Sequence, residues 1–418
     1  MKFTPEKINL ALICIVIFSI ATKLLFVFAS EMYLSPQTFE YEKLASNVLS
    51  GAGFAMKYAG TNYYTVGHPL YPLLCAVLYY FTNHSLLAIL LAQILVVSLL
   101  CVLVFFIAKR QIGAYAGLLA ALLVALHPGL FIYSTSKLHP LPLDAFLFAA
   151  VILMFLVIKD KPTLNLSILG GLILGICALS RSTILIFFLI AAGWFLFSAK
   201  AGRRRAAILM AIMGVFAFLV ILPWSIRNYK VYKRPVLILN NLGLNLWIGN
   251  NPNASGSALT REGEAVLRTM PEDNWHRFLE MNEMEQGDFL KDEALRFIEE
   301  NPVTFLKLYF KKMFYFWWFS PQSGLLYPKE WLNIYKTLYA VMLVFFALGL
   351  YQTLFISKNK EAILILLFFL SICATQAIFF VEGRHRWAIE PLMMIYVAAS
   401  MRSLKAKFIN FFIHSQFG

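Results

Sequence analysis

Residues 86–108 decide the fold class, and they read L-L-A-I-L-L-A-Q-I-L-V-V-S-L-L-C-V-L-V-F-F-I-A. It is long enough to cross a bilayer as a helix and is apolar on every side, whereas a core helix of a soluble protein needs only one apolar stripe. A second run of this kind covers residues 338–356. Of the 418 residues, 60% are hydrophobic and only 14% are charged. This composition excludes an ordinary soluble protein and predicts an all-α polytopic membrane protein.

The formal net charge of +14 does not indicate a nucleic-acid partner, because the basic residues flank the apolar runs. The five cysteines lie inside apolar segments without the spacing of metal ligands. The sequence therefore predicts neither a disulfide framework nor a zinc site. Residues 8–29 exceed the usual length of the apolar core of a signal peptide, so we expect an uncleaved first span; a cleaved signal peptide is the alternative.

Five short basic turns indicate how the chain threads the membrane, because cytoplasmic loops carry the excess of Lys and Arg. The turns cover residues 109–110, 159–161, 200–205, 358–360 and 402–407. All five lie on one side only if an even number of spans separates each pair. We predict about ten transmembrane helices with both termini in the cytoplasm. They cover residues 8–29, 84–108, 113–132, 143–158, 164–180, 182–198, 206–222, 337–356, 361–380 and 388–401.

This threading puts the polar segments on the opposite, outer face, where we expect juxtamembrane helices. Residues 288–300 carry apolar side chains at helical spacing, and Asn301-Pro302 ends the pattern. Residues 303–319 mix lysines with aromatic rings, which suits a helix in the headgroup layer; an aromatic belt is the alternative. We expect three regions. They are a membrane module with the first polar loop (1–222), an outer segment with juxtamembrane helices (223–335) and C-terminal transmembrane helices (336–418).

The first polar loop, residues 35–72, holds two candidate catalytic carboxylates. Glu40 and Glu42 flank Tyr41 at the start of an expected helix over 39–49, which a glycine ends. On a helix the two carboxylates point about 200° apart, so only one can face a given site. A hydroxyl acceptor that attacks a sugar carbon needs one carboxylate to take its proton, while cations stabilise the leaving phosphate.

Cations on the outer face are candidates for binding that phosphate. Arg181 stands between two apolar runs, where an arginine normally has a partner; marking a helix turn is the alternative. Arg227 lies in a segment whose positive charge breaks the positive-inside trend, and its guanidinium can bind a phosphate through two N–H groups. Arg384 and Arg386 occupy a short outer turn, and His68 lies in the first polar loop. We assign all five to donor-phosphate binding.

Motifs for other donors are missing from the sequence. It contains no Gly-rich nucleotide loop and no H-E-x-x-H, G-x-S-x-G or D-x-D motif. A nucleotide-sugar donor therefore has little support. A sugar on a lipid phosphate, presented at the membrane boundary, fits the outer cations better.

Six motifs carry a family resemblance. They are Y-E-K-L-A-S-N-V-L-S-G-A-G-F (41–54), G-H-P-L-Y-P (67–72), A-L-S-R-S (178–182), P-W-S-I-R-N-Y (223–229), N-L-G-L-N-L-W-I-G-N-N-P-N-A-S-G (241–256) and G-R-H-R-W-A-I-E-P (383–391). Together they resemble the multi-span GT-C glycosyltransferases. Within that class the chain is most similar to bacterial relatives of the protein O-mannosyltransferases and the lipid A aminoarabinose transferases.

The resemblance implies an inverting transfer from a polyprenyl-phosphate sugar at the periplasmic face, with an acidic residue of the first polar loop as base. It also implies a membrane module of about seven spans followed by further helices. By position, His68 matches a residue that contacts the donor phosphate, and Arg386 matches the family's arginine before the last helix. Gln37 stands where relatives usually carry aspartate, which leaves the base role to Glu40. The second outer loop, where many relatives have glutamate, offers only His139 and Asp144.

We therefore expect a glycosyltransferase that moves a sugar from a polyprenyl-phosphate donor to a hydroxyl acceptor on a lipid, glycan or protein, at the periplasmic face of the bacterial inner membrane. Substrate contacts are expected from Tyr41, Tyr71, His139, Asp144, Asn250 and Asn251; for the asparagines a turn is the alternative. No metal-ligand set is predicted, and a divalent cation is left open as a cofactor. The expected partners are the donor, membrane lipids and the acceptor. Two other classes stay open: a transporter or flippase for polyprenyl lipids or sugars, and a non-catalytic GT-C-like lipid-binding protein.

Overall fold

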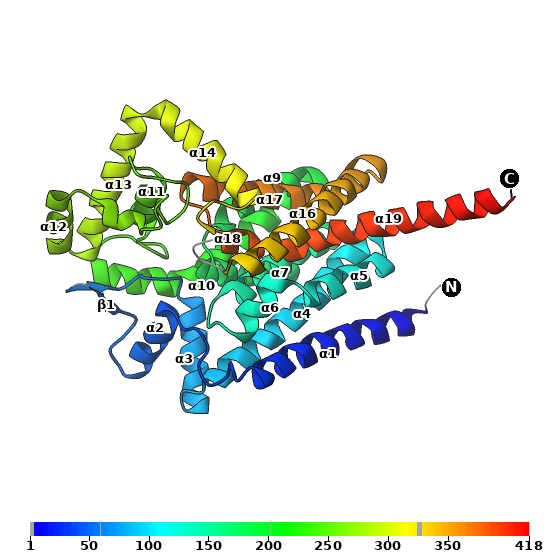
Figure 1. The fold of residues 1–418 in the computed structure, drawn as a ribbon, viewed down its shortest axis with the longest axis horizontal. Coiled ribbons are helices and arrows are strands. Elements are labelled where there is room, and N and C mark those ends of the chain that lie inside the picture. Colours follow the sequence, from blue (N-terminus) through cyan, green and yellow to red (C-terminus); the bar gives the residue numbers. More distant parts are fainter. Residues whose placement is uncertain (1–3, 59, 201, 324–327, 418) are drawn as a thin grey trace.

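The structure, a computed structural model, describes residues 4–58, 60–200, 202–323 and 328–417, with side chains described as far as Leu404. Most of this part is helical (Figure 1). Its named strands form one short antiparallel hairpin, β1 (Met56–Tyr58) and β2 (Thr61–Tyr63). The predicted all-α polytopic fold is confirmed.

Six helices in the described ranges are long and apolar enough to cross a membrane. They are α1 (Pro5–Ala29), α4 (Leu86–Ile112), α7 (Leu141–Asp160), α10 (Arg203–Tyr232), α16 (Lys329–Tyr351) with its continuation η2 (Gln352–Ile356), and α17 (Glu361–Ile378). The bent pair α5 (Ala114–Ala125) and α6 (Pro128–Thr135) would be a seventh span. Shorter apolar helices are α3 (Leu70–Thr82), α8 (Leu164–Ser180) and α9 (Ile184–Ser198). Each predicted span overlaps one of these helices or α19 (Glu390–Phe417), but their length and composition do not confirm ten spans.

The bend between α5 and α6 has a local cause. The two helices meet at 49°, and Pro128 at the start of α6 cannot continue the hydrogen bonding of α5. His127 caps α6, because its Nδ1 accepts a hydrogen bond from the Leu130 N–H (3.1 Å). Lys23, buried in α1, donates from Nζ to the Ala125 carbonyl at the end of α5 (3.1 Å). The lysine that interrupts the first apolar run thus caps a helix end, where a cation is favourable.

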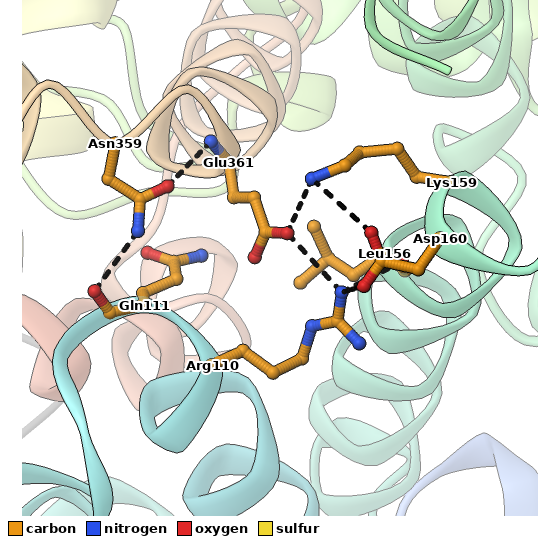
Figure 2. A network of polar contacts seen from close by, with 7 residues as sticks. All are labelled: Arg110, Gln111, Leu156, Lys159, Asp160, Asn359 and Glu361. Carbon is orange, nitrogen blue, oxygen red and sulfur yellow. Dashed lines mark hydrogen bonds and ion pairs between the residues drawn. The ribbon is translucent and has the colours of Figure 1, made fainter. Parts of the chain in front are cut away.

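The five basic turns that were predicted to share one side meet at one end of the bundle. Figure 2 shows Glu361 between Lys159 (2.6 Å) and Arg110 (3.3 Å), which joins three of the turns. Arg205 and Arg402 tie the other two turns to this end by donating to backbone carbonyls there. The predicted grouping is confirmed, and Figure 1 shows α1 beginning and α19 ending at this end. We call it the basic end.

The short helices and polar segments lie toward the opposite end (Figure 1). These helices are α2 (Glu40–Leu49), α11 (Leu242–Gly249), η1 (Val266–Thr269), α12 (Glu272–Glu280), α13 (Glu283–Glu300), α14 (Pro302–Trp317) and α18 (Gly383–Trp387). α2 covers the helix predicted over 39–49, and α13 and α14 meet at the predicted break. α10 continues through Pro223 to Tyr232, so the expected region boundary after residue 222 falls inside a helix.

Two charged residues anchor the first polar loop at this end. The buried Glu283 carboxylate, at the start of α13, accepts hydrogen bonds from the N–H groups of Tyr64 (2.6 Å) and Thr65 (3.1 Å). A carboxylate is also favourable at a helix N-terminus. Arg227, near the end of α10, donates to the carbonyls of Phe54 (2.6 Å) and Tyr64 (2.8 Å). The loop is therefore held from both α10 and α13, which fixes the position of α2.

Candidate functional site

A cavity of about 400 Å³ lies where segments from both halves of the chain converge. Its wall combines two arginines, three histidines and one aspartate with apolar side chains. The lining residues are Tyr41, His68, His139, Pro140, Asp144, Ser180, Arg181, Ser182, Thr183, Leu237, Ile238, Leu239, Asn241, Leu242, Asn245, Gln376, Phe379, Phe380, Arg384 and His385. They come from the first polar loop, the polar ends of α7 and α8, the segment before α11, the end of α17, and α18. We call this space the polar cavity.

Arg181 and Asp144 form an ion pair in the cavity wall. Arg181 directly follows α8, and Asp144 lies in the first turn of α7. Arg181 Nη1 donates to Asp144 Oδ2 (3.1 Å), and the Ser180 hydroxyl donates to Oδ1 (2.6 Å). Asp144 is only 1% exposed, and a buried carboxylate of this kind requires such partners. The pair fixes the position of Arg181 without enclosing its guanidinium, whose side chain stays 17% exposed.

Three histidines line the cavity, and one ring nitrogen of each accepts a hydrogen bond from a backbone N–H. The contacts join Ser182 N to His68 Nε2 (3.0 Å), Leu141 N to His139 Nδ1 (3.1 Å), and Glu382 N to His385 Nδ1 (3.3 Å). Burial and the charge of Arg181 lower the pKa of His68 to about 3. Burial, followed by the charges of the two cavity arginines, holds the pKa values of His139 and His385 well below the usual range. All three imidazoles are therefore neutral at physiological pH.

Arg384 supplies the second guanidinium of the wall, from the short helix α18. Its Nε pairs with Glu382 Oε2 at 2.8 Å, two residues earlier in the chain. After burial, the charge of Arg384 is the largest cause that lowers the pKa of His139 and of Lys137. Two guanidinium groups from distant parts of the sequence thus act on the same space.

Tyr41 is the residue by which α2 reaches the cavity. Its ring packs edge to face against His139 and Tyr71, with ring centroids 5.7 and 5.6 Å apart. Burial, followed by the charge of Glu40, raises the pKa of its hydroxyl. Tyr71 lies behind this ring and donates its hydroxyl proton to Gln93 Oε1 (2.6 Å). Tyr71 is not in the wall and instead supports Tyr41.

Neither predicted catalytic carboxylate lines the cavity. Glu42 accepts a hydrogen bond from the Ser46 hydroxyl (3.0 Å), and its charge acts on the ionisation of Tyr79 in α3. Glu40 is half-buried, and its carboxylate has no hydrogen-bond or ion-pair partner among the described residues. The charge of Glu40 helps to raise the pKa of the neighbouring Tyr41, which lines the cavity.

Arg386 lies outside the cavity and is 0% exposed. Its Nε donates to Glu390 Oε1 (2.7 Å), and its Nη1 donates to the carbonyls of Phe316 (3.1 Å) and Trp318 (3.3 Å). The guanidinium stacks on the Tyr339 ring, 3.8 Å from the ring centroid. These contacts join α14, α16, α18 and α19, so the structure gives this arginine protein partners in place of the expected phosphate.

Arg227, Asn250 and Asn251 also lie outside the cavity. Arg227 holds the first polar loop, as described above. Asn250 Nδ2 donates to the Ile378 carbonyl (2.9 Å), and its Oδ1 accepts from Lys312 Nζ (3.0 Å). Asn251 Nδ2 donates to a carbonyl of α11 (2.7 Å) and its Oδ1 accepts from a backbone N–H two residues on, which is the turn arrangement expected as the alternative.

The structure brings six of the predicted site residues into one wall. They are Tyr41, His68, His139, Asp144, Arg181 and Arg384. Sequence reasoning missed His385, although it stands between two arginines that were predicted. It also missed Asn245 on α11 and Gln376 on α17, which only the fold brings together. Within the ranges that the structure describes, no group of three or more His, Cys, Asp or Glu side chains is arranged to hold a metal ion.

A family model matches a part of the chain that contributes eight of the twenty lining residues. Residues 66–226 match the model described as dolichyl-phosphate-mannose-protein mannosyltransferase. The matched segment contains His68, His139, Asp144 and Arg181. No curated protein matches the chain.

Solved structures of an archaeal oligosaccharyltransferase share the fold. AglB from Archaeoglobus fulgidus, in complex with an inhibitory peptide and a dolichol-phosphate, superposes with a TM-score of 0.58 at 12% identity, covering 98% of this chain and 52% of AglB. The A. fulgidus oligosaccharyltransferase tethered to an acceptor peptide gives a TM-score of 0.61 at 12% identity, with coverages of 97% and 50%. Its complex with Zn and sulfate gives 0.56 at 13% identity, with coverages of 95% and 49%.

The chain thus spans about half the length of these neighbours, and at such low identity the likeness concerns the fold. The matched segment and the shared architecture point to the same class. The resemblance to the GT-C membrane glycosyltransferases that the sequence motifs indicated is thereby confirmed.

Proposed function

We propose that this chain is a GT-C-type glycosyltransferase that moves a sugar, with inversion, from a polyprenyl-phosphate donor to a hydroxyl acceptor. The polar cavity carries the proposal. Its wall sets Arg181, Arg384 and neutral imidazoles beside apolar side chains such as Phe379 and Leu239. A wall of this kind suits a ligand with an anionic group and an apolar part, and a lipid phosphate has both.

The comparisons support a lipid-phosphate donor. The description of the matching family model names a dolichyl-phosphate mannose donor and a protein acceptor. The AglB structure contains a dolichol-phosphate. For this chain we infer the shared element, a sugar on a polyprenyl phosphate, and we leave the sugar and the acceptor open among lipids, glycans and proteins.

We assign the reaction to the periplasmic face of a bacterial inner membrane. The basic turns gather at the basic end, and loops rich in Lys and Arg stay in the cytoplasm. The polar cavity belongs to the segments toward the opposite end (Figure 1). A lipid-linked sugar presented at the outer boundary of the membrane would meet it there.

In the proposed reaction the acceptor oxygen attacks the anomeric carbon while the bond from that carbon to the phosphate oxygen breaks. The electron pair of this bond leaves with the phosphate, which gains a negative charge that Arg181 and Arg384 stabilise. The hydroxyl proton passes to a carboxylate, for which we propose Glu40, since it is unpaired in the described chain and adjoins Tyr41. Asp144 accepts hydrogen bonds from Arg181 and Ser180 and therefore acts as a positioning residue.

A turnover assay tests the proposal. The purified protein is incubated with a panel of polyprenyl-phosphate sugars and simple hydroxyl acceptors, and release of polyprenyl phosphate is measured. Glu40→Gln is expected to lower kcat by roughly 10²-fold to 10⁴-fold, the usual contribution of a general base. Glu42→Gln, the matched change on the other side of α2, should keep the wild-type rate. The opposite order would move the base to Glu42, and no release by the wild type from any donor would sink the transferase proposal.

One observation favours a second candidate, a non-catalytic lipid-phosphate-binding protein. The carboxylate that lines the cavity, Asp144, is engaged by Arg181, and the unpaired Glu40 stands outside the wall. Such a protein would bind polyprenyl phosphate with the same residues. Its wild type and its Glu40→Gln variant would both bind polyprenyl phosphate in a separate binding measurement and would release none from any donor in the turnover assay, which separates it from the enzyme.

A further inference from the structure

The three cavity histidines share a geometry that fixes which ring nitrogen carries the proton. A backbone N–H can only donate, so the ring nitrogen that it contacts must present a lone pair. His68 Nε2, His139 Nδ1 and His385 Nδ1 occupy this position, at 3.0, 3.1 and 3.3 Å. A neutral imidazole has a single N–H. The proton therefore lies on Nδ1 of His68 and on Nε2 of His139 and His385.

These three N–H groups are free to meet a ligand. Among the described residues, none of the three proton-bearing nitrogens has a hydrogen-bond partner, since the contacts of each ring fall on its other nitrogen. All three rings belong to the wall of the polar cavity. An N–H donor that faces the cavity without a protein partner needs an acceptor there, and a ligand oxygen can supply it.

His127, outside the cavity, shows what the same geometry does beside an anion. Its Nδ1 accepts from the Leu130 N–H at 3.1 Å, which leaves the proton on Nε2. That Nε2 lies 2.5 Å from a carboxylate oxygen of Glu390. One histidine of this chain thus already presents a backbone-fixed N–H to an oxyanion.

We propose that His68, His139 and His385 bind the phosphate oxygens of the lipid donor as neutral N–H donors, while Arg181 and Arg384 supply the positive charge. The inference rests on the proposed function and deepens it, because it adds His385 to the ligand site and specifies the protonation state of all three rings. Neutral donors add hydrogen bonds without placing further positive charge beside two guanidinium groups. Burial and these guanidinium groups also keep the pKa values of the three rings low, in agreement with the geometry.

The fixed tautomers also make these rings poor metal ligands. A metal ion would need the lone pair of the nitrogen that now carries the proton, and the proton would move to the nitrogen that meets the backbone N–H. Two donors would then face each other at about 3 Å, as at Leu141 N and His139 Nδ1. We therefore expect the phosphate to contact the three rings directly.

Nitrogen NMR tests the tautomers without reference to any activity. The whole protein is labelled with ¹⁵N-histidine in detergent at pH 7, and His68→Asn, His139→Gln and His385→Gln assign the signals by their loss. Each ring is expected to be neutral, with its proton on Nδ1 in His68 and on Nε2 in the other two. An imidazolium, or the opposite tautomer, at any of the three would overturn the inference.

Binding of polyprenyl monophosphate tests the ligand contact at His385. His385→Phe keeps a ring but removes the donor, and we expect its Kd to rise roughly 10-fold to 100-fold, the range for one hydrogen bond to a charged group. His385→Gln keeps an N–H at similar reach and should lose less than about 10-fold. His276→Phe is the control, because His276 is exposed and its one ion pair among the described residues is with Glu272. A Kd for His385→Phe equal to that of the wild type, or an equal loss in both His385 variants, would refute the donor role.

The two measurements separate this inference from the proposed function. A wild type that binds no polyprenyl phosphate overturns both. Binding in the predicted order of variants without any sugar transfer overturns the transferase proposal and leaves the histidine inference standing. Equal binding by all variants, with transfer intact, overturns the histidine inference alone.

Discussion

Replacing Arg386 by methionine decides whether this arginine serves the fold, as the structure indicates, or the donor phosphate, as the sequence suggested. Arg386 and Glu390 are both 0% exposed, and their Nε and Oε1 atoms lie 2.7 Å apart. Methionine roughly fills the space of the side chain but leaves the Glu390 carboxylate, within the described part of the chain, with His127 and Tyr335 as partners. Removing one member of a buried ion pair costs about 3–5 kcal/mol. The lost hydrogen bonds to the carbonyls of Phe316, at the end of α14, and of Trp318, directly after it, add to this cost.

Thermal unfolding in detergent, followed by the loss of the monodisperse peak in size-exclusion chromatography, measures this effect. Arg386→Met should lower the midpoint strongly. The double variant Arg386→Met with Glu390→Leu should regain part of the loss, because it no longer buries an unpaired carboxylate. Arg234→Met is the matched control: its ion pair with Asp288 is 2.6 Å long but both side chains are about half exposed, at 58% and 46%. An exposed pair contributes only about 0–1 kcal/mol, so this midpoint should barely move.

The reasoning fails if Arg386→Met unfolds like Arg234→Met and yet no longer binds polyprenyl phosphate. That outcome would return Arg386 to the ligand site and would mean that its contacts to Glu390 contribute little stability.

Three further predictions follow from single contacts. Asp144→Asn keeps the size of the side chain but removes the charge that orients Arg181, so KM for the lipid donor should rise roughly 10-fold with a smaller change in kcat; an unchanged KM contradicts the positioning role. Gly249→Ala should lower the thermal midpoint, because a Cβ there would lie 2.0 Å from the carbonyl oxygen that follows α17, whereas Gly193→Ala has open space and should not; equal midpoints would refute the close approach. Burial lowers the pKa of Lys312 to about 7, so the unfolded chain binds more protons between pH 7 and 10. The stability of the wild type relative to Lys312→Met should therefore rise with pH by up to about 1.4 kcal/mol per pH unit in this range, and a flat difference in urea unfolding would contradict it.

The parts of the fold that the sequence predicted correctly have local causes. α2 begins with two acidic residues and ends before Gly51, whose φ of +80° lies in the left-handed region that glycine adopts easily. The break between α13 and α14 follows from Pro302, which cannot continue a helix. The grouping of the basic turns follows from the count of spans between them. Each of the first two signals lies within a few residues of sequence, and the third needs only the rule that an even number of spans returns the chain to the same side.

Other features depend on tertiary contacts that no local pattern contains. Pro223 suggested the end of a span, yet α10 continues for nine more residues to Tyr232. The returning chain stabilises this extension, because Asn228 Nδ2 donates to the carbonyls of Val236 (3.1 Å) and Ile238 (3.0 Å), and Trp224 Nε1 also donates to Ile238 (3.0 Å). The extension carries Arg227 to the first polar loop and away from the cavity. The sequence pattern indicated that this arginine needs partners, but it could not predict that backbone carbonyls of the first polar loop would supply them.

Arg384 and Arg386 show the same limit at the scale of one helical turn. Two residues apart in α18, they point about 200° from each other, so only one can face a given cavity. A sequence pattern assigns both to the same role. The packing of α18 against α14 and α19 decides that Arg384 lines the cavity and that Arg386 is buried.

Exposure of the guanidinium distinguishes Arg181 from Arg386, because the Arg181 side chain stays 17% exposed whereas Arg386 is 0% exposed. Arg386 donates hydrogen bonds from Nε to Glu390 and from Nη1 to two carbonyls, and aromatic rings cover its guanidinium. Among the described residues, the guanidinium of Arg181 donates a hydrogen bond only from Nη1, to Asp144. A guanidinium has five N–H groups, so Arg181 keeps enough of them for a bidentate contact with a phosphate. In the proposed transfer, Asp144 would fix the orientation of Arg181 before the donor arrives, so that no reorganisation would be needed as negative charge develops on the leaving phosphate. We therefore expect an arginine that a carboxylate holds from one side, and that stays partly exposed, to be available to a ligand, whereas the complete burial of Arg386 keeps it from one.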